Sequence, residues 1–355
     1  MRIFLTGSNY FSLLTRIQNA LLKKKHEVET LEFKIPRGGW RNFIDFSFPA
    51  QIQLLNFPFL WKGELPQFYR DYNMEVRERL GVTQPDILLV IRGEFLKNET
   101  VKYARDLKVK IFLWMYDSIY LYSEVEKYLN SVDQFFAYEP RDVYYVKSKY
   151  KIPSNYLMLG YDPDEYFPID PHQYECDLLF VGALYPNRIK ILNSVCRSFA
   201  QQYRVQIHAD YVTKDRFWRW IDLKIRYPFL LKCLKPGIHS HREINKMFNY
   251  SKININIHNA TKSVEQGTNY RFFELLGSGS FQLVEKKWLA KAGIEDGDGI
   301  ISYQSENDLL EKIDYYLKHD SQRKAVIERG RKISQLHKIE NRIDSILAQF
   351  SKDFM

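Results

Sequence analysis

The chain has 355 residues, of which 45% are hydrophobic and 27% charged, so it is neither disordered nor fibrous and has room for two domains. Its net charge of +9 predicts an anionic partner, either a phosphorylated small molecule or an anionic lipid surface. Nucleic acid is the least favoured partner, because no zinc-finger, RNA-recognition or heptad-linked basic signature occurs.

The cysteines and the apolar runs indicate the cellular compartment of the protein. Three widely spaced cysteines form no metal or disulfide pattern, which indicates a reducing compartment. The first residues read directly as a strand, and no apolar run of about 18 residues occurs. We therefore expect a cytoplasmic protein with neither a signal peptide nor a membrane span.

A buried-strand pattern at residues 2–6 ends in Gly7 and Ser8 and is followed by leucines at helical spacing. A strand, a small-residue turn and a helix open a doubly wound α/β fold, in which the turn faces the ligand. Gly7 is not part of a G-x-G-x-x-G motif, so a dinucleotide site is unsupported. Either the turn lets a substrate oxygen approach the backbone, or it is an ordinary tight turn.

The apolar runs at residues 86–91 and 110–114 predict parallel strands. Arg92 starts a loop at the carboxyl end of the first run, and Asp117 follows the second at the same edge, where open α/β sheets bind ligands. Asp117 is therefore a candidate general base or sugar-hydroxyl acceptor, with a helix N-cap as the alternative. Before these strands, one helix is expected at residues 50–55.

The strand–glycine–helix pattern then restarts, with an apolar run at residues 176–181, a turn at Gly182 and a helix opened by Arg188. Two such beginnings imply two Rossmann-like lobes. The expected bounds are 1–160 for the first lobe, 161–173 for a linker rich in proline and acids, 174–335 for the second lobe, and 336–355 for a final helix that docks on another element.

Residues 212–242 carry eight Lys or Arg side chains against two aspartates, interleaved with aromatic and aliphatic residues. Such a segment either lies on an anionic bilayer surface or forms a hairpin that packs its rings inward. Two D-x-D patterns, at residues 162–164 and 296–298, lie in turn-like composition, and we interpret neither as a metal site.

A short helix is expected after Asn269, closed by Gly277 or Gly279 as its C-cap. Asn269, Arg271 and Glu274 gather near its start, where free backbone N–H groups and the helix dipole attract anions. An arginine fork and an amide suit a diphosphate, and a carboxylate suits a ribose diol. An Arg–Glu pair on a solvated helix face is the alternative.

Four segments together resemble the GT-B sugar-nucleotide glycosyltransferases, in the family 4-like, group 1 branch that includes spore-maturation-protein-type enzymes. They are the linker at 160–168, the strand and turn at 180–188, the strand at 254–258, and the motif N-x-R-x-F-E at 269–274 with Gly279. The amino half resembles the family only in its strand pattern.

This resemblance implies two Rossmann-like lobes that face each other across a cleft, with the last helix crossing back to the first lobe. The donor would be bound mainly by the second lobe, with Glu274 on the ribose hydroxyls and Arg188 on the diphosphate. Asn269, Arg271 and His258 would lie around the phosphate and the sugar. The family has a second acid eight residues before Glu274, and this chain departs from that pattern with Gln266, which leaves donor preference and anomeric outcome open.

The implied activity is metal-independent transfer of a sugar, with retention, from a nucleotide sugar to a hydroxyl group. The acceptor would be a glycan, a lipid-linked molecule or a protein in bacterial surface polysaccharide or glycoconjugate synthesis, and no cofactor is expected. Gly7 with Ser8, and Gly182, would contribute to nucleotide-sugar binding, and Asp117 would serve the acceptor. Segment 212–242 would place the enzyme at the inner face of the membrane. The alternative, suggested by Gln266, is a non-catalytic nucleotide-sugar-binding module.

Overall fold

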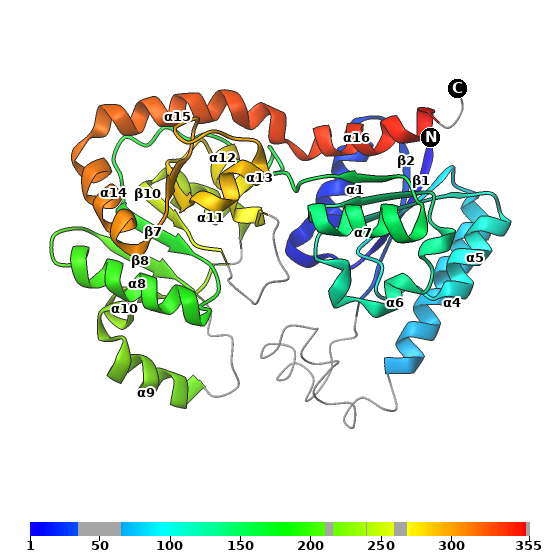
Figure 1. Cartoon of the computed structure of the whole chain (residues 1–355), viewed down its shortest axis with the longest axis horizontal. Helices are drawn as coiled ribbons and strands as arrows, with labels where there is room; N and C mark the ends of the chain where they lie inside the picture. Colours follow the sequence, from blue (N-terminus) through cyan, green and yellow to red (C-terminus); the bar gives the residue numbers. More distant parts are fainter. Residues whose placement is uncertain (35–64, 210–215, 239, 259–267, 353–355) are drawn as a thin grey trace. The chain divides into compact units, whose positions relative to one another are not determined.

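A computed structural model describes residues 1–34, 65–209, 216–238, 240–258 and 268–352, which fold into two compact units (Figure 1). The first unit consists of Met1–Met158 and the segment from Ile339 onward, and the second lies between them in the sequence. The helix expected at residues 50–55 lies outside the described residues.

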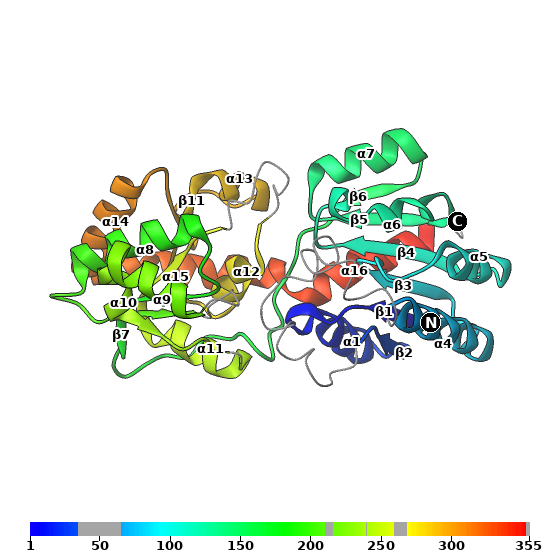
Figure 2. The ribbon, with the colours of Figure 1, turned by 90° about the horizontal axis from the view of Figure 1, so that it is seen from below.

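The first unit has a six-stranded parallel sheet in the order β2-β1-β3-β4-β5-β6, whose strands lie side by side in Figure 2. The strands are β1 (Arg2–Gly7), β2 (Glu27–Glu32), β3 (Ile87–Ile91), β4 (Lys110–Met115), β5 (Gln134–Ala137) and β6 (Ser154–Tyr156). Every residue of β3 is buried, as expected for a strand that is covered on both faces. The strand order reverses between β1 and β3, and open parallel sheets bind ligands at the carboxyl ends next to such a reversal.

Helices cover both faces of this sheet. They are α1 (Leu13–Lys23), α4 (Leu65–Thr83), α5 (Asn98–Asp106), α6 (Ser123–Glu126), α7 (Pro140–Tyr150) and α16 (Ile339–Lys352), with short 3₁₀ turns at Tyr10–Ser12, Ile119–Leu121 and Leu129–Ser131. Val76 of α4 and Val101 of α5 join Phe4 and Leu88 of the sheet in one buried apolar cluster. Outside that cluster α16 packs on α1, so the expected return of the last helix to the first unit is confirmed.

The second unit has a second six-stranded parallel sheet, in the order β12-β11-β10-β7-β8-β9. Its strands are β7 (Cys176–Val181), β8 (Val205–His208), β9 (Leu234–Lys235), β10 (Ser251–Asn256), β11 (Gln282–Glu285) and β12 (Ile301–Tyr303). The order reverses between β7 and β10. Two doubly wound parallel sheets confirm the predicted α/β class.

The helices of the second unit pack on both faces of its sheet (Figure 1). They are α8 (Pro186–Phe199), α9 (Arg216–Arg226), α10 (Pro228–Cys233), α11 (His241–Asn249), α12 (Tyr270–Gly277), α13 (Leu289–Ala292), α14 (Glu306–Lys318) and α15 (Asp320–Ser334), with 3₁₀ turns at Lys286–Trp288 and Gln335–His337. Helices α8, α10 and α14 share a buried cluster with Leu178 and Ile253 of the sheet. Helix α12 contacts β10 and β11 of the sheet as well as α11 and α15.

Two glycines are required by close packing. Gly7 has φ of +145°, and a Cβ there would lie 2.2 Å from the carbonyl oxygen of Ile91 on the neighbouring strand. A Cβ on Gly277, in the last turn of α12, would lie 2.3 Å from the ring of Tyr161. The local contact with Ile91 therefore explains the glycine at position 7 without any ligand, which supports the ordinary-turn alternative for that residue.

Candidate functional sites

The carboxyl edge of the second sheet holds the residues expected to bind the donor. Gly182 follows β7, and His258 lies two residues beyond β10, so the two flank the reversal of strand order. The backbone N–H of Asn269, the N-cap of α12, donates to Nε2 of His258 at 3.1 Å. This acceptance assigns the proton of the neutral imidazole to Nδ1. The His258 ring also stacks on Trp288 at 4.1 Å between centroids.

Asn269 fixes where α12 begins. Its side-chain oxygen accepts from the Phe272 N–H at 2.9 Å, which satisfies one of the free donors of the first turn. Its amide nitrogen donates to Oδ1 of Asn256 at 3.0 Å, at the end of β10. The predicted helix therefore begins where expected. At its other end, Ser278 is the C-cap and Gly279 follows with φ of +64°, a position that favours glycine.

Arg271 and Glu274 lie one turn apart on α12 and form an ion pair, Nη1 to Oε2, at 2.8 Å. The alternative interpretation, an Arg–Glu pair on a solvated helix face, is therefore right about the ion pair. It is wrong about the solvated face, because the Glu274 side chain is only 5% exposed and the Arg271 side chain 23% exposed. The Arg271 guanidinium also lies over the Phe248 ring of α11, 5.1 Å from its centroid.

Arg188, in the first turn of α8, is the second candidate for binding the diphosphate. Its Nε donates to the Ile257 carbonyl at 2.8 Å and its Nη1 to the Ala183 carbonyl at 2.9 Å. Burial, with the nearby charge of Arg271, lowers its pKa to about 10, so it stays charged at neutral pH. No carboxylate among the described residues forms an ion pair with it. An arginine held by neutral carbonyls keeps its charge available for an anion.

Gly182 leaves room for that guanidinium: a Cβ at this position would lie 3.5 Å from the Arg188 Nη1 atom and 3.3 Å from the Phe180 ring. Gln266, the residue in place of the second acid, lies outside the described residues.

In the first unit, Ser8 and Asp117 lie close to a buried arginine that the sequence interpretation did not assign to the site. Arg92, 4% exposed, donates from Nη1 to Oδ2 of Asp117 at 3.1 Å and also pairs with Glu94. Ser8 donates to Oε1 of Glu94 at 3.5 Å. Asp117 also accepts from the Tyr122 hydroxyl at 2.9 Å, so its contacts are side-chain contacts at the sheet edge and not an N-cap.

Burial raises the pKa of both Glu94 and Asp117 above their ordinary values, while the Arg92 charge opposes the shift. The sequence placed Arg92 at this edge without a role, and Glu94 could have been found by the same signal that selected Asp117, its place just after a buried strand.

Comparison with known proteins shows which families the chain resembles. Residues 188–348 match the model of the family described as "Glycosyl transferase-like". Spore protein CgeB of Bacillus subtilis is 19% identical over 263 residues, covering 68% of this chain and 74% of CgeB. The chain therefore has the GT-B fold, and its residues 188–348 resemble glycosyltransferases.

Several solved structures share the fold of this chain over almost its whole length. The sucrose-phosphate synthase of Thermosynechococcus elongatus is 11% identical with a TM-score of 0.65, covering 100% of this chain and 99% of that chain. Anabaena HepE, solved with UDP-glucose, is 10% identical with a TM-score of 0.64, covering 99% of this chain and 100% of that chain.

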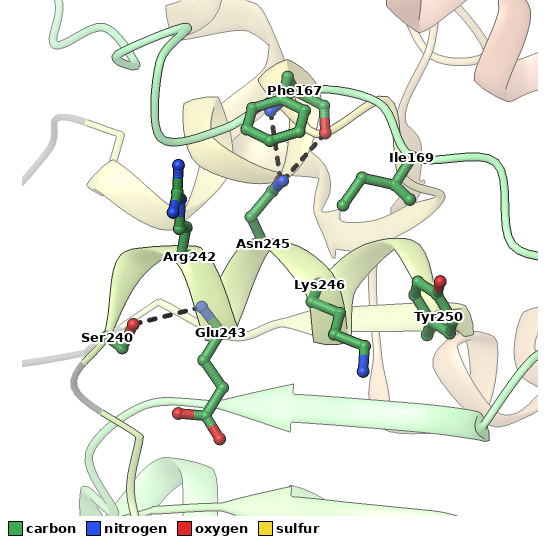
Figure 3. A pocket seen from close by; sticks show the side chains of 8 residues that line it. All are labelled: Phe167, Ile169, Ser240, Arg242, Glu243, Asn245, Lys246 and Tyr250. Atoms are coloured by element: carbon green, nitrogen blue, oxygen red, sulfur yellow. Dashed lines mark hydrogen bonds between the residues drawn. The ribbon is translucent and has the colours of Figure 1, made fainter.

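Figure 3 shows an open surface pocket of the second unit, beside α11. Asn245 extends from α11 toward Phe167, whose backbone N–H donates to its Oδ1 at 3.3 Å and whose carbonyl accepts from its Nδ2 at 3.1 Å. Arg242, Glu243 and Lys246 add charges of both signs. These contacts hold the segment that enters the second unit, and the pocket includes none of the predicted donor residues.

The two D-x-D patterns have local partners in the described structure. Asp296 accepts from the N–H and the hydroxyl of Ser302 at 2.7 and 2.8 Å, and Asp162 accepts from the Asp164 N–H at 2.9 Å. Both aspartates therefore hold turns.

The basic segment forms α9 and α10, and its buried side chains include Leu223 and Leu230, whereas Ile225 is 73% and Phe229 38% exposed. The segment therefore packs part of its apolar surface inward and leaves part outside. No helix in the described part of the chain combines the length and apolar character that a membrane crossing needs.

Proposed function

We propose that the protein is a glycosyltransferase that takes its sugar from a nucleoside-diphosphate donor bound at the carboxyl edge of the second sheet. One observation carries the proposal: Arg188 is largely buried, stays charged, and is held by two carbonyls without a carboxylate partner. The pair of Arg271 and Glu274 lies at the start of α12, near the same reversal of strand order. HepE, a protein of the same fold, was solved with UDP-glucose, which favours this ligand class.

The reaction follows from these charges. The bond between the sugar C1 and the diphosphate oxygen breaks, and the diphosphate leaves with the electron pair. A bond from the acceptor oxygen to C1 forms, and the hydroxyl proton leaves. Arg188, Arg271 and the amino end of α12 would stabilise the negative charge that develops on the diphosphate. Glu274 would hold the ribose hydroxyls, and His258 would lie by the sugar.

Because arginines and a helix end supply this positive charge, the transfer proceeds without a metal ion. The described residues include no group of three or more potential metal ligands at this edge. We also propose retention of the anomeric configuration, which is described for trehalose-6-phosphate synthase, a protein of similar fold with a TM-score of 0.63.

The acceptor would be bound by the first unit, with Asp117 by its hydroxyl, in the synthesis of a bacterial surface polysaccharide or glycoconjugate in the cytoplasm. Helices α9 and α10 would hold the enzyme at an anionic membrane surface. Exposed Ile225 and Phe229 with the neighbouring Arg226 and Lys232 support this contact. Flotation with anionic liposomes tests it: binding at low salt that weakens at high salt is expected, and absence of binding at low salt would refute it.

The donor site is tested by the melting temperature in the presence of UDP and a metal chelator. A ligand at 100 times its dissociation constant stabilises the protein by about 2.7 kcal/mol, and at its dissociation constant by about 0.4 kcal/mol. Loss of the Glu274 hydrogen bonds to a ribose should cost about 2.7 kcal/mol of binding free energy, which raises the dissociation constant of UDP by about a hundredfold. Glu274→Ala should therefore remove most of the UDP-induced rise.

The control variant is Glu306→Ala, on α14. Its UDP-induced rise in melting temperature should match that of the wild type. A full rise in Glu274→Ala would refute the ribose assignment, and a rise that requires added Mg²⁺ would refute metal independence. Release of UDP from UDP-glucose in the presence of a glycan extract separates an enzyme from a binding module.

A further inference from the structure

The carboxyl edge of the first sheet holds a buried arginine in an unusual backbone conformation. Arg92, directly after β3, has φ of +66°, and Gly93 follows with φ of +76°. A residue other than glycine pays a conformational cost in this region, and it persists only where the surroundings hold it there. The conformation turns the chain at the end of β3, next to the reversal of strand order between β1 and β3.

Two carboxylates and three aromatic rings enclose this guanidinium. Glu94 and Asp117 both pair with Arg92, and the rings of Tyr10, Tyr116 and Tyr122 have centroids 4.4, 5.2 and 5.1 Å from its Cζ atom. One positive charge therefore faces two carboxyl groups. An anionic ligand at this edge would be repelled by the two carboxylates, and Arg92, which already pairs with both, would not be available to bind it.

The two carboxylates differ in the hydrogen bonds that their oxygens already accept. Oδ2 of Asp117 accepts from both Arg92 and the Tyr122 hydroxyl. Oε1 of Glu94 accepts from Arg92 and from Ser8. Oε2 of Glu94 is buried and has no hydrogen-bond partner among the described residues, although the Glu94 side chain is only 7% exposed. A buried acceptor without a donor is costly, and a ligand hydroxyl would remove that cost.

We propose that Glu94 is a specificity-determining residue that accepts a hydrogen bond from a hydroxyl of an uncharged acceptor sugar. Ser8 and Asp117 lie beside it as further polar groups for the same sugar, and Tyr10, 38% exposed, offers a ring face at the same edge. The acidic surroundings select against a phosphate or a carboxylate on the part of the acceptor that docks here. This inference rests on the proposed sugar transfer.

The test is saturation-transfer NMR on the whole chain with UDP present. The probes are neutral monosaccharides (glucose, galactose, mannose and N-acetylglucosamine) and glucose 6-phosphate. We expect at least one neutral sugar to bind the wild type and glucose 6-phosphate to bind more weakly than glucose. Loss of a hydrogen bond to a charged group should weaken sugar binding by about tenfold in Glu94→Gln. Glu99→Gln, at an exposed position five residues on, should bind as the wild type does.

A second variant, Glu94→Asp, keeps the charge opposite Arg92 and withdraws the carboxylate by one methylene, so it should lose sugar binding even if Glu94→Gln does not fold. Three results would overturn the proposal: no signal from any neutral sugar, unchanged binding in both Glu94 variants, or preference for glucose 6-phosphate. The melting-temperature rise with UDP separates the two proposals, because Glu94 variants should retain it. If that rise is absent from the wild type, the donor assignment fails instead.

Discussion

Substitution of Asn269 tests whether a small hydrogen-bond network sets the start of α12. Asn269→Ala removes the cap of the Phe272 N–H and the donor to Oδ1 of Asn256, a residue only 2% exposed. Loss of an N-cap costs about 1 kcal/mol. The lost amide bond costs about 1–2 kcal/mol more, because it leaves a buried acceptor unsatisfied. The sum, about 2–3 kcal/mol, corresponds to a fall of roughly 5–10 °C in melting temperature for a unit of this size.

The matched control is Ser305→Ala at the start of α14, where the serine side chain caps the Asp308 N–H and makes no second hydrogen bond within the described structure. Only the cap is lost there, so a fall of about 2–4 °C is expected. Asn269→Ser keeps a capping oxygen and should lie between the two. Thermal unfolding followed by circular dichroism measures all three. If Asn269→Ala falls no further than Ser305→Ala, the contact with Asn256 does not hold the helix.

Two further predictions concern the same unit. Gly277→Ala should lower its melting temperature by several degrees, because the new Cβ would lie 2.3 Å from the Tyr161 ring and overpacking costs about 1–3 kcal/mol; an unchanged value would show that the ring moves aside freely. Although burial opposes it, the Lys252 ammonium, 2.7 Å away, and a backbone N–H hold the pKa of Asp177 below its ordinary value of 3.8. Its contribution to stability is therefore present above pH 3.8 and is lost as the pH falls below it, so Asp177→Asn should be less stable than the wild type at pH 7 and converge with it in acid. A constant difference across that range would contradict the assignment.

The strands and α12 were predictable because their signals are local. Continuous apolar runs give the buried parallel strands, and an asparagine followed by an apolar segment and a glycine gives the bounds of α12. Helix α4 was not predicted, because its sequence mixes tyrosines, charges and few aliphatic residues, and the first unit buries it through only a few of them, including Tyr72, Val76 and Leu80. Burial of that kind depends on the tertiary partner.

The site was predictable in part for the same reason. Asn269, Arg271 and Glu274 lie within six residues, so helical spacing alone brings them together. Arg92, Glu94 and Asp117 meet through the pairing of β3 with β4 and through the positive φ of Arg92, and neither feature is readable from residue type. Asp117 and Arg92 were both placed at this edge from their strands, but the ion pair between them and the part played by Glu94 were identified only from the structure.

The two sheet edges differ in charge in the way that the proposed sugar transfer requires of each. At the second sheet, Arg188 keeps its positive charge without a carboxylate partner, which suits a diphosphate that gains negative charge as it leaves. At the first sheet, carboxylates outnumber the arginine, which suits a hydroxyl that loses its proton. Neutralising a charge at one edge should therefore weaken the binding of one substrate and spare the other. Neutralising Glu94 should weaken the acceptor and leave UDP binding unchanged, whereas Arg188→Gln should weaken UDP and leave neutral-sugar binding at the first unit unchanged. Loss of both ligands in either variant would refute this division of the chemistry between the two units.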